Sequence, residues 1–315
     1  MKNKKLITGF IVAVVLLLVV ESYIYINNNR QQKNHTKITF VVTGDNFDNY
    51  ENMIAGAETA AMDEDCFVDF INSPTEYGIE GEIELLERQL TDGADYIVTV
   101  SSDYEAMKEY VNKANVSGKV LFVENGIYGD LKNSIMVDDK ELAGDFANYI
   151  IEKSKASKLL LVSTKEDINT KTLRTEIENA LEGSDIILEY RLLSATTGTI
   201  NQSMYNLGQS GFFDGFITLD YETLEAAAKA QSKLKKSVEV YSVDNSKEAV
   251  YYLDSNLINA LAFKDDYSMG FLAVKDALAG NLRKQSESDE KLYYISDKET
   301  IHSDKLEKVL FPFVK

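Results

Sequence analysis

The chain has 315 residues and carries 51 acidic against 33 basic side chains, a formal net charge of −18 at pH 7. Nucleic acids and anionic lipid headgroups would repel so acidic a protein, which makes both poor partners. The single cysteine excludes an internal disulfide framework, and the two histidines, His35 and His302, cannot assemble a His-based catalytic triad or a histidine metal cluster. The fold must therefore be held by its hydrophobic core, and the length suits two domains.

The N-terminus consists of a basic segment followed by a long apolar run. Residues 1–5 include three lysines, and residues 6–26 are largely apolar, with Glu21 as their only charged residue. A membrane span needs about 20 apolar residues, and no small-x-small cleavage motif follows this run. We therefore predict a cytoplasmic segment at 1–5 and a transmembrane anchor at 6–26, with a cleaved signal peptide as the alternative. The flanking lysines and tyrosines predict a single-pass protein of the cell membrane with its N-terminus in the cytoplasm and its bulk outside.

The rest of the chain alternates between short apolar runs and helix-length segments. Residues 27–36 are polar without apolar periodicity and are predicted to form a stalk. The runs predicted as strands are Ile38–Val42, Tyr96–Val100, Val120–Val123, Ile135–Val137, Leu159–Val162, Ile186–Leu188, Phe216–Leu219, Val238–Val243 and Ile258–Phe263. Such alternation gives βαβ units and mostly parallel sheets, and so many strands favour two doubly wound α/β domains over one. With only two prolines in the chain, we expect short crossovers between the domains.

The segment from Ile38 to Tyr50 has the pattern of a small-molecule site. A buried-strand run leads into a polar loop that carries Asp45 and Phe47, and Asp48 is a candidate N-cap for the helix that follows. In open α/β sheets, ligands bind beyond the carboxyl ends of the strands. We therefore predict that Asp45, Phe47 and Tyr50 stand at such a site. Tyr50 also lies on the apolar face of the expected helix, so a core role is its alternative.

The motifs of common enzyme sites are absent from the sequence. It contains no GxSxG elbow, no GxxxxGK[ST] phosphate loop, no GxGxxG fingerprint and no HExxH. Acidic pairs such as Asp138-Asp139 and Asp265-Asp266 are interpreted as solvated surface or helix caps, since none has the spacing of a calcium loop. The sequence therefore predicts neither a metal site nor a cofactor.

Four segments, taken in order, resemble the type I periplasmic binding protein superfamily, in its ribose- and galactose-binding branch. They are Ile38–Ala57 with the helix glycine Gly56, then Gly93–Val98, then Ser134–Asp139, and finally Val243–Asn245 followed by Ala260–Phe263 and Tyr267–Gly270. The resemblance covers the chain from about Lys37 to its C-terminus. It implies two doubly wound parallel-sheet lobes joined by a three-crossover hinge that closes on a ligand. The expected N-terminal lobe is 37–137 plus 265–290, and the C-terminal lobe is 138–264 plus 291–315.

The same resemblance implies a set of ligand-binding positions. They are Asp45, Phe47 and Tyr50 from the first loop, Ser101 or Ser102 from the next, Glu124 with Asn125, Asp220, Asp244 and Lys264. Glu124 and Asn125 stand where the family keeps an Asp-Arg pair for sugar hydroxyls. Asp244 keeps the family's hydroxyl-binding aspartate, and Lys264 takes the place of a glutamine. Asp244 has an alternative role as the cap of a helix beginning near Ser246.

Two departures from the family pattern bear on the ligand. The arginine that the family offers after its first second-lobe strand falls on Leu173, with Arg174 one residue away. The family's asparagine position falls on Leu219, which leaves Asp220 beside it. Losing these donors argues against a simple pentose or hexose. The alternatives are another polar ligand, such as an amine-bearing one, or a pocket that no longer binds.

The function implied by the resemblance is that of an extracytoplasmic solute-binding protein for a sugar or sugar-like ligand, without chemical turnover. Its partner would be a membrane histidine kinase in two-component sensing or an ABC permease in uptake. One alternative is a degenerate binding module that docks a membrane partner without a ligand. Another is a carbohydrate-active enzyme that would use Asp45 or Glu124 with Asp244.

Overall fold

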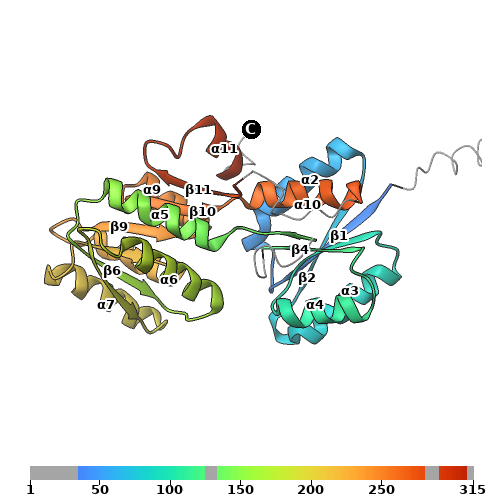
Figure 1. The fold of residues 1–315 in the computed structure, drawn as a ribbon, viewed down its shortest axis with the longest axis horizontal. Helices are drawn as coiled ribbons and strands as arrows, with labels where there is room; N and C mark the ends of the chain where they lie inside the picture. The colour runs from blue at the N-terminus through green and yellow to red at the C-terminus, as the bar shows by residue number, and fades with distance from the viewer. Residues whose placement is uncertain (1–34, 125–132, 281–290, 311–315) are drawn as a thin grey trace, which may run out of the picture.

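The computed structural model describes residues 35–124, 133–280 and 291–310, which form two α/β lobes (Figure 1). Each lobe is built on its own sheet, and the two sheets together hold eleven strands among these residues. The expected two-lobe, parallel-sheet α/β architecture is confirmed. The residue boundaries given above for the two lobes stay predictions.

The N-terminal lobe contains a five-stranded, fully parallel sheet of order β2-β1-β3-β4-β5. Its strands are β1 (Lys37–Thr43), β2 (Phe67–Ser73), β3 (Tyr96–Val100), β4 (Val120–Val123) and β5 (Ser134–Ile135). Its helices are the 3-10 turns η1 (Asp48–Tyr50) and η2 (Thr75–Tyr77), α2 (Glu51–Glu64), α3 (Gly78–Thr91) and α4 (Tyr104–Lys113), together with α10 (Asp266–Ala279). Helices α2 and α10 cover one face of the sheet, and α3 and α4 cover the other (Figure 1). Strands covered on both faces are apolar throughout, which is why β3 and β4 are visible in the sequence.

The C-terminal lobe contains a six-stranded sheet of order β11-β10-β9-β8-β6-β7. Its strands are β6 (Lys158–Ser163), β7 (Ile187–Leu192), β8 (Gly215–Thr218), β9 (Glu239–Val243), β10 (Ala260–Lys264) and β11 (Tyr293–Asp297). Its helices are α5 (Asp139–Lys153), α6 (Ile168–Leu181), α7 (Thr197–Ser210), α8 (Tyr221–Gln231), α9 (Lys247–Asp254) and α11 (Asp304–Leu310). All pairings are parallel except that of β10 with β11, which is antiparallel.

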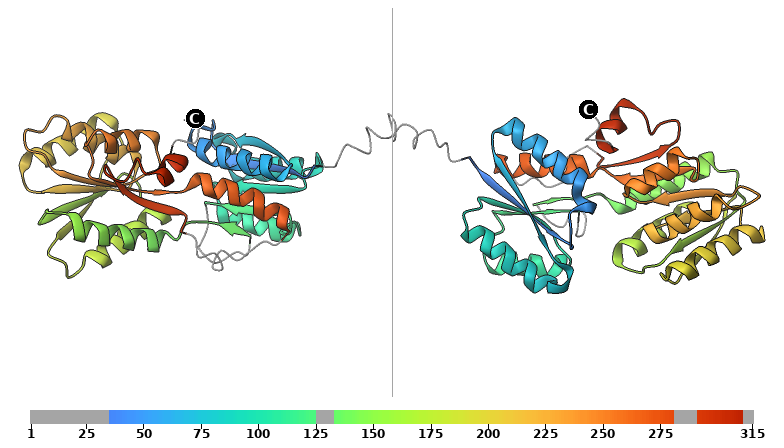
Figure 2. Two further views of the ribbon diagram at one scale, coloured as in Figure 1. Left: turned by 90° about the horizontal axis from the view of Figure 1, so that it is seen from above. Right: turned by 180° about the vertical axis from the view of Figure 1, so that it is seen from behind.

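Helices α2 and α10 lie side by side on the N-terminal lobe (Figure 2) and touch backbone to backbone at two glycines. A Cβ added to Gly56 would lie 1.9 Å from the carbonyl oxygen of Tyr267, and one added to Gly270 would lie 2.0 Å from that of Met53. Any larger residue at either position would push the helices apart. Because α10 follows a strand of the other sheet, this contact fixes one connection between the lobes.

Two connections between the lobes lie within the described residues. One runs from β5 to α5 through residues 136–138, and the other runs from β10 to α10 through Asp265. Asp138 and Asp265 are the N-caps of these helices, in line with the interpretation of their acidic pairs as caps. The expected third connection falls on residues 281–290, outside the described residues.

Several local expectations differ from the structure. Strands β2 and β11 were not expected; both are edge strands, and the residues of β2 are only partly buried. Asp48 does not cap a helix through its side chain; it begins the 3-10 turn η1, and its backbone N–H donates to Asn46 Oδ1 at 3.1 Å. The tight turn places the start of α2 at Glu51 instead.

The prediction of a single-pass membrane protein is wrong on these findings. No helix within 35–124, 133–280 and 291–310 is long and apolar enough to cross a membrane. The predicted anchor at 6–26, the basic segment at 1–5 and residues 27–34 of the predicted stalk lie outside the described residues.

Candidate functional site

A cleft of about 780 Å³ lies between the lobes, where the carboxyl ends of several strands face one another. The N-terminal lobe contributes η1 and the first turn of α2, and the C-terminal lobe contributes the loop from β9 into α9. The lining residues are Asp48, Asn49, Tyr50, Glu51, Asn52, Glu124, Tyr221, Asp244, Asn245, Ser246, Lys247, Glu248 and Asp266. The size is in the range of clefts that hold small molecules.

Tyr50 and Glu124 form the wall of the cleft on the N-terminal lobe. The Tyr50 hydroxyl donates a 2.8 Å hydrogen bond to the carbonyl oxygen of Thr43, at the end of β1. Burial, together with the nearby charge of Glu124, raises the pKa of Tyr50, so the phenol stays neutral and remains a donor. Its ring also packs against the hydrophobic core, so Tyr50 lines the cleft and contacts the core at the same time.

Glu124 directly follows β4 and has an unusual backbone. Its φ of 71° lies in the left-handed region, which non-glycine residues rarely adopt, while its N–H donates to Ile135 O at 2.9 Å. Strained backbones of this kind gather at binding sites. Burial, with a smaller contribution from Asp139, raises the pKa of Glu124, although Lys264 opposes the shift. A further cationic or hydrogen-bond-donating partner would therefore stabilise the ionised form of Glu124.

Asp244 stands on the opposite wall, in the loop that follows β9. Its N–H donates to Ala262 O at 3.0 Å, and its carboxylate accepts a 2.7 Å hydrogen bond from the N–H of Ser246. The N-cap of α9 is Ser246 itself, whose hydroxyl oxygen accepts from the N–H of Ala249 at 3.2 Å. Asp244 therefore shapes the loop rather than capping the helix. Burial raises the pKa of Asp244 despite its bond from Ser246.

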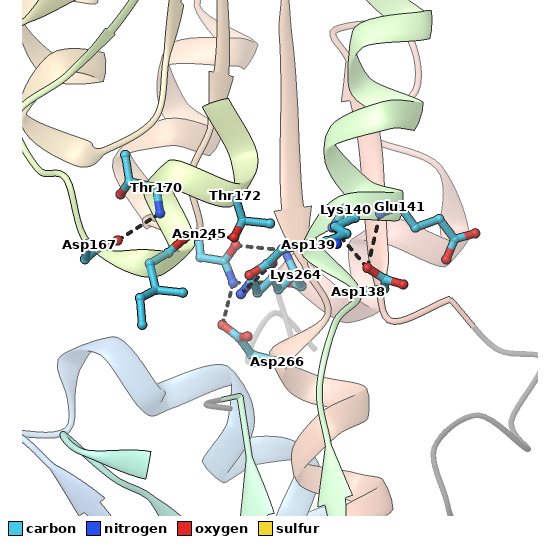
Figure 3. A network of polar contacts seen from close by, with 11 residues as sticks. Asp138, Asp139, Lys140, Glu141, Asp167, Thr170, Thr172, Asn245, Lys264 and Asp266 are labelled. Atoms are coloured by element: carbon cyan, nitrogen blue, oxygen red, sulfur yellow. Dashed lines mark hydrogen bonds and ion pairs between the residues drawn. The ribbon is translucent and has the colours of Figure 1, made fainter. Parts of the chain in front are cut away.

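A cluster of charged side chains lies at the base of the cleft, where β10 leads into α10 (Figure 3). Lys264 Nζ lies 3.0 Å from Asp139 Oδ1, and both side chains are largely buried. Asn245 Nδ2 donates to Asp266 Oδ2 at 2.8 Å, and Asn245 Oδ1 accepts from the N–H of Lys264 at 2.8 Å. Burial, together with the charge of Glu124, raises the pKa of Asp266 to about 8. Burial alone would lower the pKa of Lys264, but Asp139 and Glu124 outweigh it and raise that pKa.

One ion pair crosses the mouth of the cleft. Lys247, the first residue of α9, pairs with Glu51, the first residue of α2. The two side chains are 64 % and 37 % exposed, so solvent screens the pair and its stabilising effect is small. It nevertheless shows that the first turns of α2 and α9 lie within side-chain reach of each other.

The sequence matches the model of the periplasmic binding protein domain over residues 38–280. The chain belongs to the periplasmic binding protein family. A comparison with curated proteins finds no match.

Solved structures support the fold of this binding protein. A carbohydrate transporter solute-binding protein from Agrobacterium radiobacter, in complex with D-arabinose, is 18 % identical with a TM-score of 0.70, over 89 % of this chain and 100 % of that one. A sugar-binding protein of a sugar ABC transporter from Bacillus halodurans is 14 % identical with a TM-score of 0.72, over 85 % and 99 %. A solute-binding protein from Agrobacterium vitis with bound D-fucose is 16 % identical with a TM-score of 0.70, over 87 % and 100 %.

Three of the positions predicted from sequence line the cleft of this binding protein: Tyr50, Glu124 and Asp244. Lys264 lies behind the lining, in the charged cluster at the base. Asn125 lies outside the described residues. The structure therefore brings together groups from both lobes that are far apart in the sequence, and their role as ligand contacts stays a prediction.

The other predicted positions within the described residues do not line the cleft. Asp45 Oδ1 accepts a 3.0 Å hydrogen bond from the N–H of Thr75, and Phe47 is half-buried against the core. Both hold the loop that leads to Tyr50.

Ser101 and Ser102 follow β3 and are held by a buried glutamate of α3, Glu82. The Ser101 hydroxyl donates to Glu82 Oε2 at 2.6 Å, and the N–H of Ser102 donates to the same oxygen at 3.1 Å. The Thr43 hydroxyl, at the end of β1, donates to Glu82 Oε1 at 2.8 Å. Glu82 therefore ties together the loops that follow two strands, a role that the sequence did not indicate.

Asp220 is engaged as the N-cap of α8. It is 7 % exposed, and its carboxylate accepts from the N–H groups of Thr223 at 2.9 Å and Thr164 at 2.5 Å. These bonds leave it less available for a ligand, whereas its neighbour Tyr221 lines the cleft.

Sequence reasoning missed Asn245, Lys247 and Asp266 as cleft residues. A usable signal was present, since Asn245 and Asp266 each follow within two or three residues of a strand end. The Asp265-Asp266 pair was interpreted as solvated or capping, which holds for Asp265 but not for Asp266. Among residues 35–124, 133–280 and 291–310, no group of three His, Cys, Asp or Glu side chains is placed to hold a metal ion.

Proposed function

We propose that this periplasmic binding protein holds one small polyhydroxyl ligand, a sugar or sugar-like compound, in the cleft between its lobes and releases it unchanged. The observation that carries the proposal is the meeting of Glu124, Asp244 and Asp266 with Tyr50 in one cleft of about 780 Å³. A carboxyl group offers two oxygens for hydrogen bonds, which suits pairs of neighbouring hydroxyl groups.

Aromatic rings on both walls complement these acceptors. Tyr50 comes from the N-terminal lobe and Tyr221 from the C-terminal lobe, and both line the cleft. Such rings offer an apolar face for the C–H surface of a sugar and a hydroxyl for its polar edge. The solved structures with bound D-arabinose and D-fucose add support from the same fold.

For the downstream partner we favour an ABC permease. Two of the solved neighbours are components of carbohydrate or sugar transporters, which is the observation in its favour. Signalling to a membrane histidine kinase is the other prediction made from sequence, and no feature of the described residues favours it over uptake through a permease.

An enzyme is the weaker candidate. Of the acid–base residues considered from sequence, Asp45 does not line the cleft and is bonded to the N–H of Thr75. Glu124 and Asp244 do line it, but the family to which the chain belongs is one of binding proteins. We therefore propose binding without turnover.

A thermal-shift screen of the full chain against sugars, amino sugars, polyols and nucleosides tests the proposal. A ligand present at a hundred times its Kd stabilises the folded state by about 2.7 kcal/mol. For a protein of this size that corresponds to a rise in Tm of roughly 4–5 °C. No rise with any compound in the panel would contradict the proposal.

The variant Asp244→Ala separates ligand binding from docking without a ligand. Removing this half-buried acceptor should abolish the shift, because a ligand hydroxyl would lose its partner. The matched control Asp185→Asn removes the same charge at an exposed site far from the lining and should keep the shift. A partner interaction that survives Asp244→Ala unchanged, in a protein that binds no compound, would favour the degenerate docking module.

A further inference from the structure

The cleft is strongly acidic. Its described lining contains six acidic side chains, Asp48, Glu51, Glu124, Asp244, Glu248 and Asp266. The one basic side chain among the described lining residues is Lys247, and Glu51 already neutralises it. An uncharged sugar would leave this excess of negative charge in place, whereas a cation would offset it.

Asp266 is the group in this cleft that most lacks a partner. It is 8 % exposed, and its Oδ2 is occupied by Asn245 at 2.8 Å. Its Oδ1 is buried without any hydrogen-bond partner among the described residues. A buried carboxylate oxygen without a donor is costly, so the site is arranged for a donor that the chain itself does not supply.

The nearby lysine does not supply that donor. Lys264 Nζ is engaged 3.0 Å from Asp139 Oδ1. At the base of the cleft, Lys264 therefore serves three acidic side chains, those of Glu124, Asp139 and Asp266. The groups that act on Asp266 are Glu124 and Asp265, which raise its pKa, and Lys264 and Asn245, which lower it, and burial has the largest effect. The balance keeps Asp266 mostly protonated near pH 7 without a ligand, and a cation bound next to Oδ1 would lower its pKa and hold it in the ionised form.

We propose that the ligand carries a protonated amine as well as hydroxyl groups, in the manner of an amino sugar, and that its ammonium group binds between Asp266 and Glu124. This inference rests on the proposed function, since it names the ligand class of the same cleft. An ammonium group has three N–H donors, enough for the free Asp266 oxygen and for Glu124. Asp244 and Tyr50 remain for the hydroxyl groups and the C–H face. A bare metal ion fits less well, because such a cleft is far larger than one ion and the described residues contain no metal-binding group.

Isothermal titration of the full chain at pH 7 with matched pairs tests this ligand class. The pairs are glucosamine with glucose, galactosamine with galactose and mannosamine with mannose, and each N-acetyl derivative is the uncharged control of similar shape. Charge-assisted hydrogen bonds are strong enough that we expect the amine of at least one pair to bind roughly tenfold to a hundredfold more tightly than its neutral parent. The N-acetyl derivative should lose that advantage.

The variant Asp266→Asn tests whether Asp266 causes the preference for the amine. Asparagine keeps the shape and the bond with Asn245 but cannot ionise when the ammonium group binds, so the preference for the amine should fall to within about threefold. Binding of the neutral parent should persist, and Asp185→Asn should keep the full preference. Circular dichroism melting of both variants checks that the fold is intact.

The outcomes separate the two proposals. Neutral sugars that bind as tightly as their amines, or an amine preference that survives Asp266→Asn, would overturn the inference and leave the proposed function standing. Tight binding of Ca²⁺ alone at the same place, shown by competition, would also overturn it. If neither amines nor neutral sugars bind, the proposed function itself fails and the inference fails with it.

Discussion

Replacing Lys264 by methionine is expected to destabilise the protein strongly at neutral pH and clearly less at acidic pH. Methionine keeps most of the length of the lysine side chain and removes its charge. The ammonium group lies 3.0 Å from Asp139, and the two side chains are only 16 % and 17 % exposed. Without it, Glu124, Asp139 and Asp266 would face one another without a counter-charge at the base of the cleft.

The size of the effect follows from this burial. Removing one partner of a buried ion pair costs about 3–5 kcal/mol, and the slight exposure of this pair places it near 3 kcal/mol. For a protein of this size that is a fall in Tm of roughly 4–6 °C. The matched control is Lys247→Met, because Lys247 is also paired with a glutamate but is 64 % exposed. It should cost less than about 1 kcal/mol.

The loss of stability on replacing Lys264 should be smaller at acidic pH than at neutral pH. Burial already raises the pKa of Glu124 and of Asp266, and losing Lys264 raises both further because the lysine lowers them in the native protein. Asp266 already holds most of its proton at pH 7.5, so the relief of repulsion at pH 5 comes from proton uptake by Glu124, and at least half of the loss seen at pH 7.5 should disappear.

Urea unfolding of the full chain followed by circular dichroism at pH 5.0 and 7.5 measures these differences. The double variant Lys264→Met with Asp139→Asn should recover part of the stability at pH 7.5, because it removes one of the unpaired charges. A loss below about 0.5 kcal/mol at pH 7.5, or an equal loss at both pH values, would refute the assignment of Lys264 as the counter-charge of this cluster.

Two further predictions concern the contact between α2 and α10 and the carboxyl group of Asp266. Gly56→Ala places a Cβ 1.9 Å from Tyr267 O, so it should cost at least about 1–3 kcal/mol in urea unfolding, whereas Gly144→Ala, which meets nothing within 4 Å, should be neutral or stabilising. Equal effects of the two would contradict the backbone contact. Burial raises the pKa of Asp266 from 3.8 to about 8, so the folded state holds this proton more tightly than the unfolded state does. The resulting contribution to stability is fully present below about pH 4 and is lost as the pH rises through 8. Asp266→Asn should therefore gain stability relative to the native protein between pH 5 and pH 9, and a constant difference across that range would be evidence against the buried, proton-holding carboxyl.

The central strands could be predicted from the sequence because burial on both faces leaves a plain signature. Val120–Val123 is a continuous apolar run and Tyr96–Val100 is interrupted only by Thr99, and they are the strands β4 and β3. The edge strands β2 and β11 lack this signature. The residues of β2 are mostly half-buried or exposed, and β11 pairs on one side with β10. Local sequence does not reveal an edge strand whose partner is distant in the chain.

Part of the site could be predicted because polar residues beyond strand ends tend to line the clefts of α/β sheets. Tyr50 was predicted from that rule, Glu124 and Asp244 were implied by the family resemblance, and all three line the cleft. Asp266 was missed because its importance depends on Asn245, on the loss of any donor to Oδ1 and on burial against a second lobe. Conversely, Asp220 satisfies the same strand-end rule but is occupied by Thr164 and Thr223. Hydrogen-bond partners that come from other elements decide which candidates remain available.

Hydrogen exchange of the full chain, with and without the tightest ligand from the screen, tests most directly that the cleft between the lobes is the binding site. Residues 48–52 of the N-terminal lobe and 244–248 of the C-terminal lobe line opposite walls. A ligand held between them should slow exchange in both segments together, and Asp244→Ala should abolish the slowing in both. Slowing confined to one segment, or found at another surface while both stay unchanged, would contradict the account.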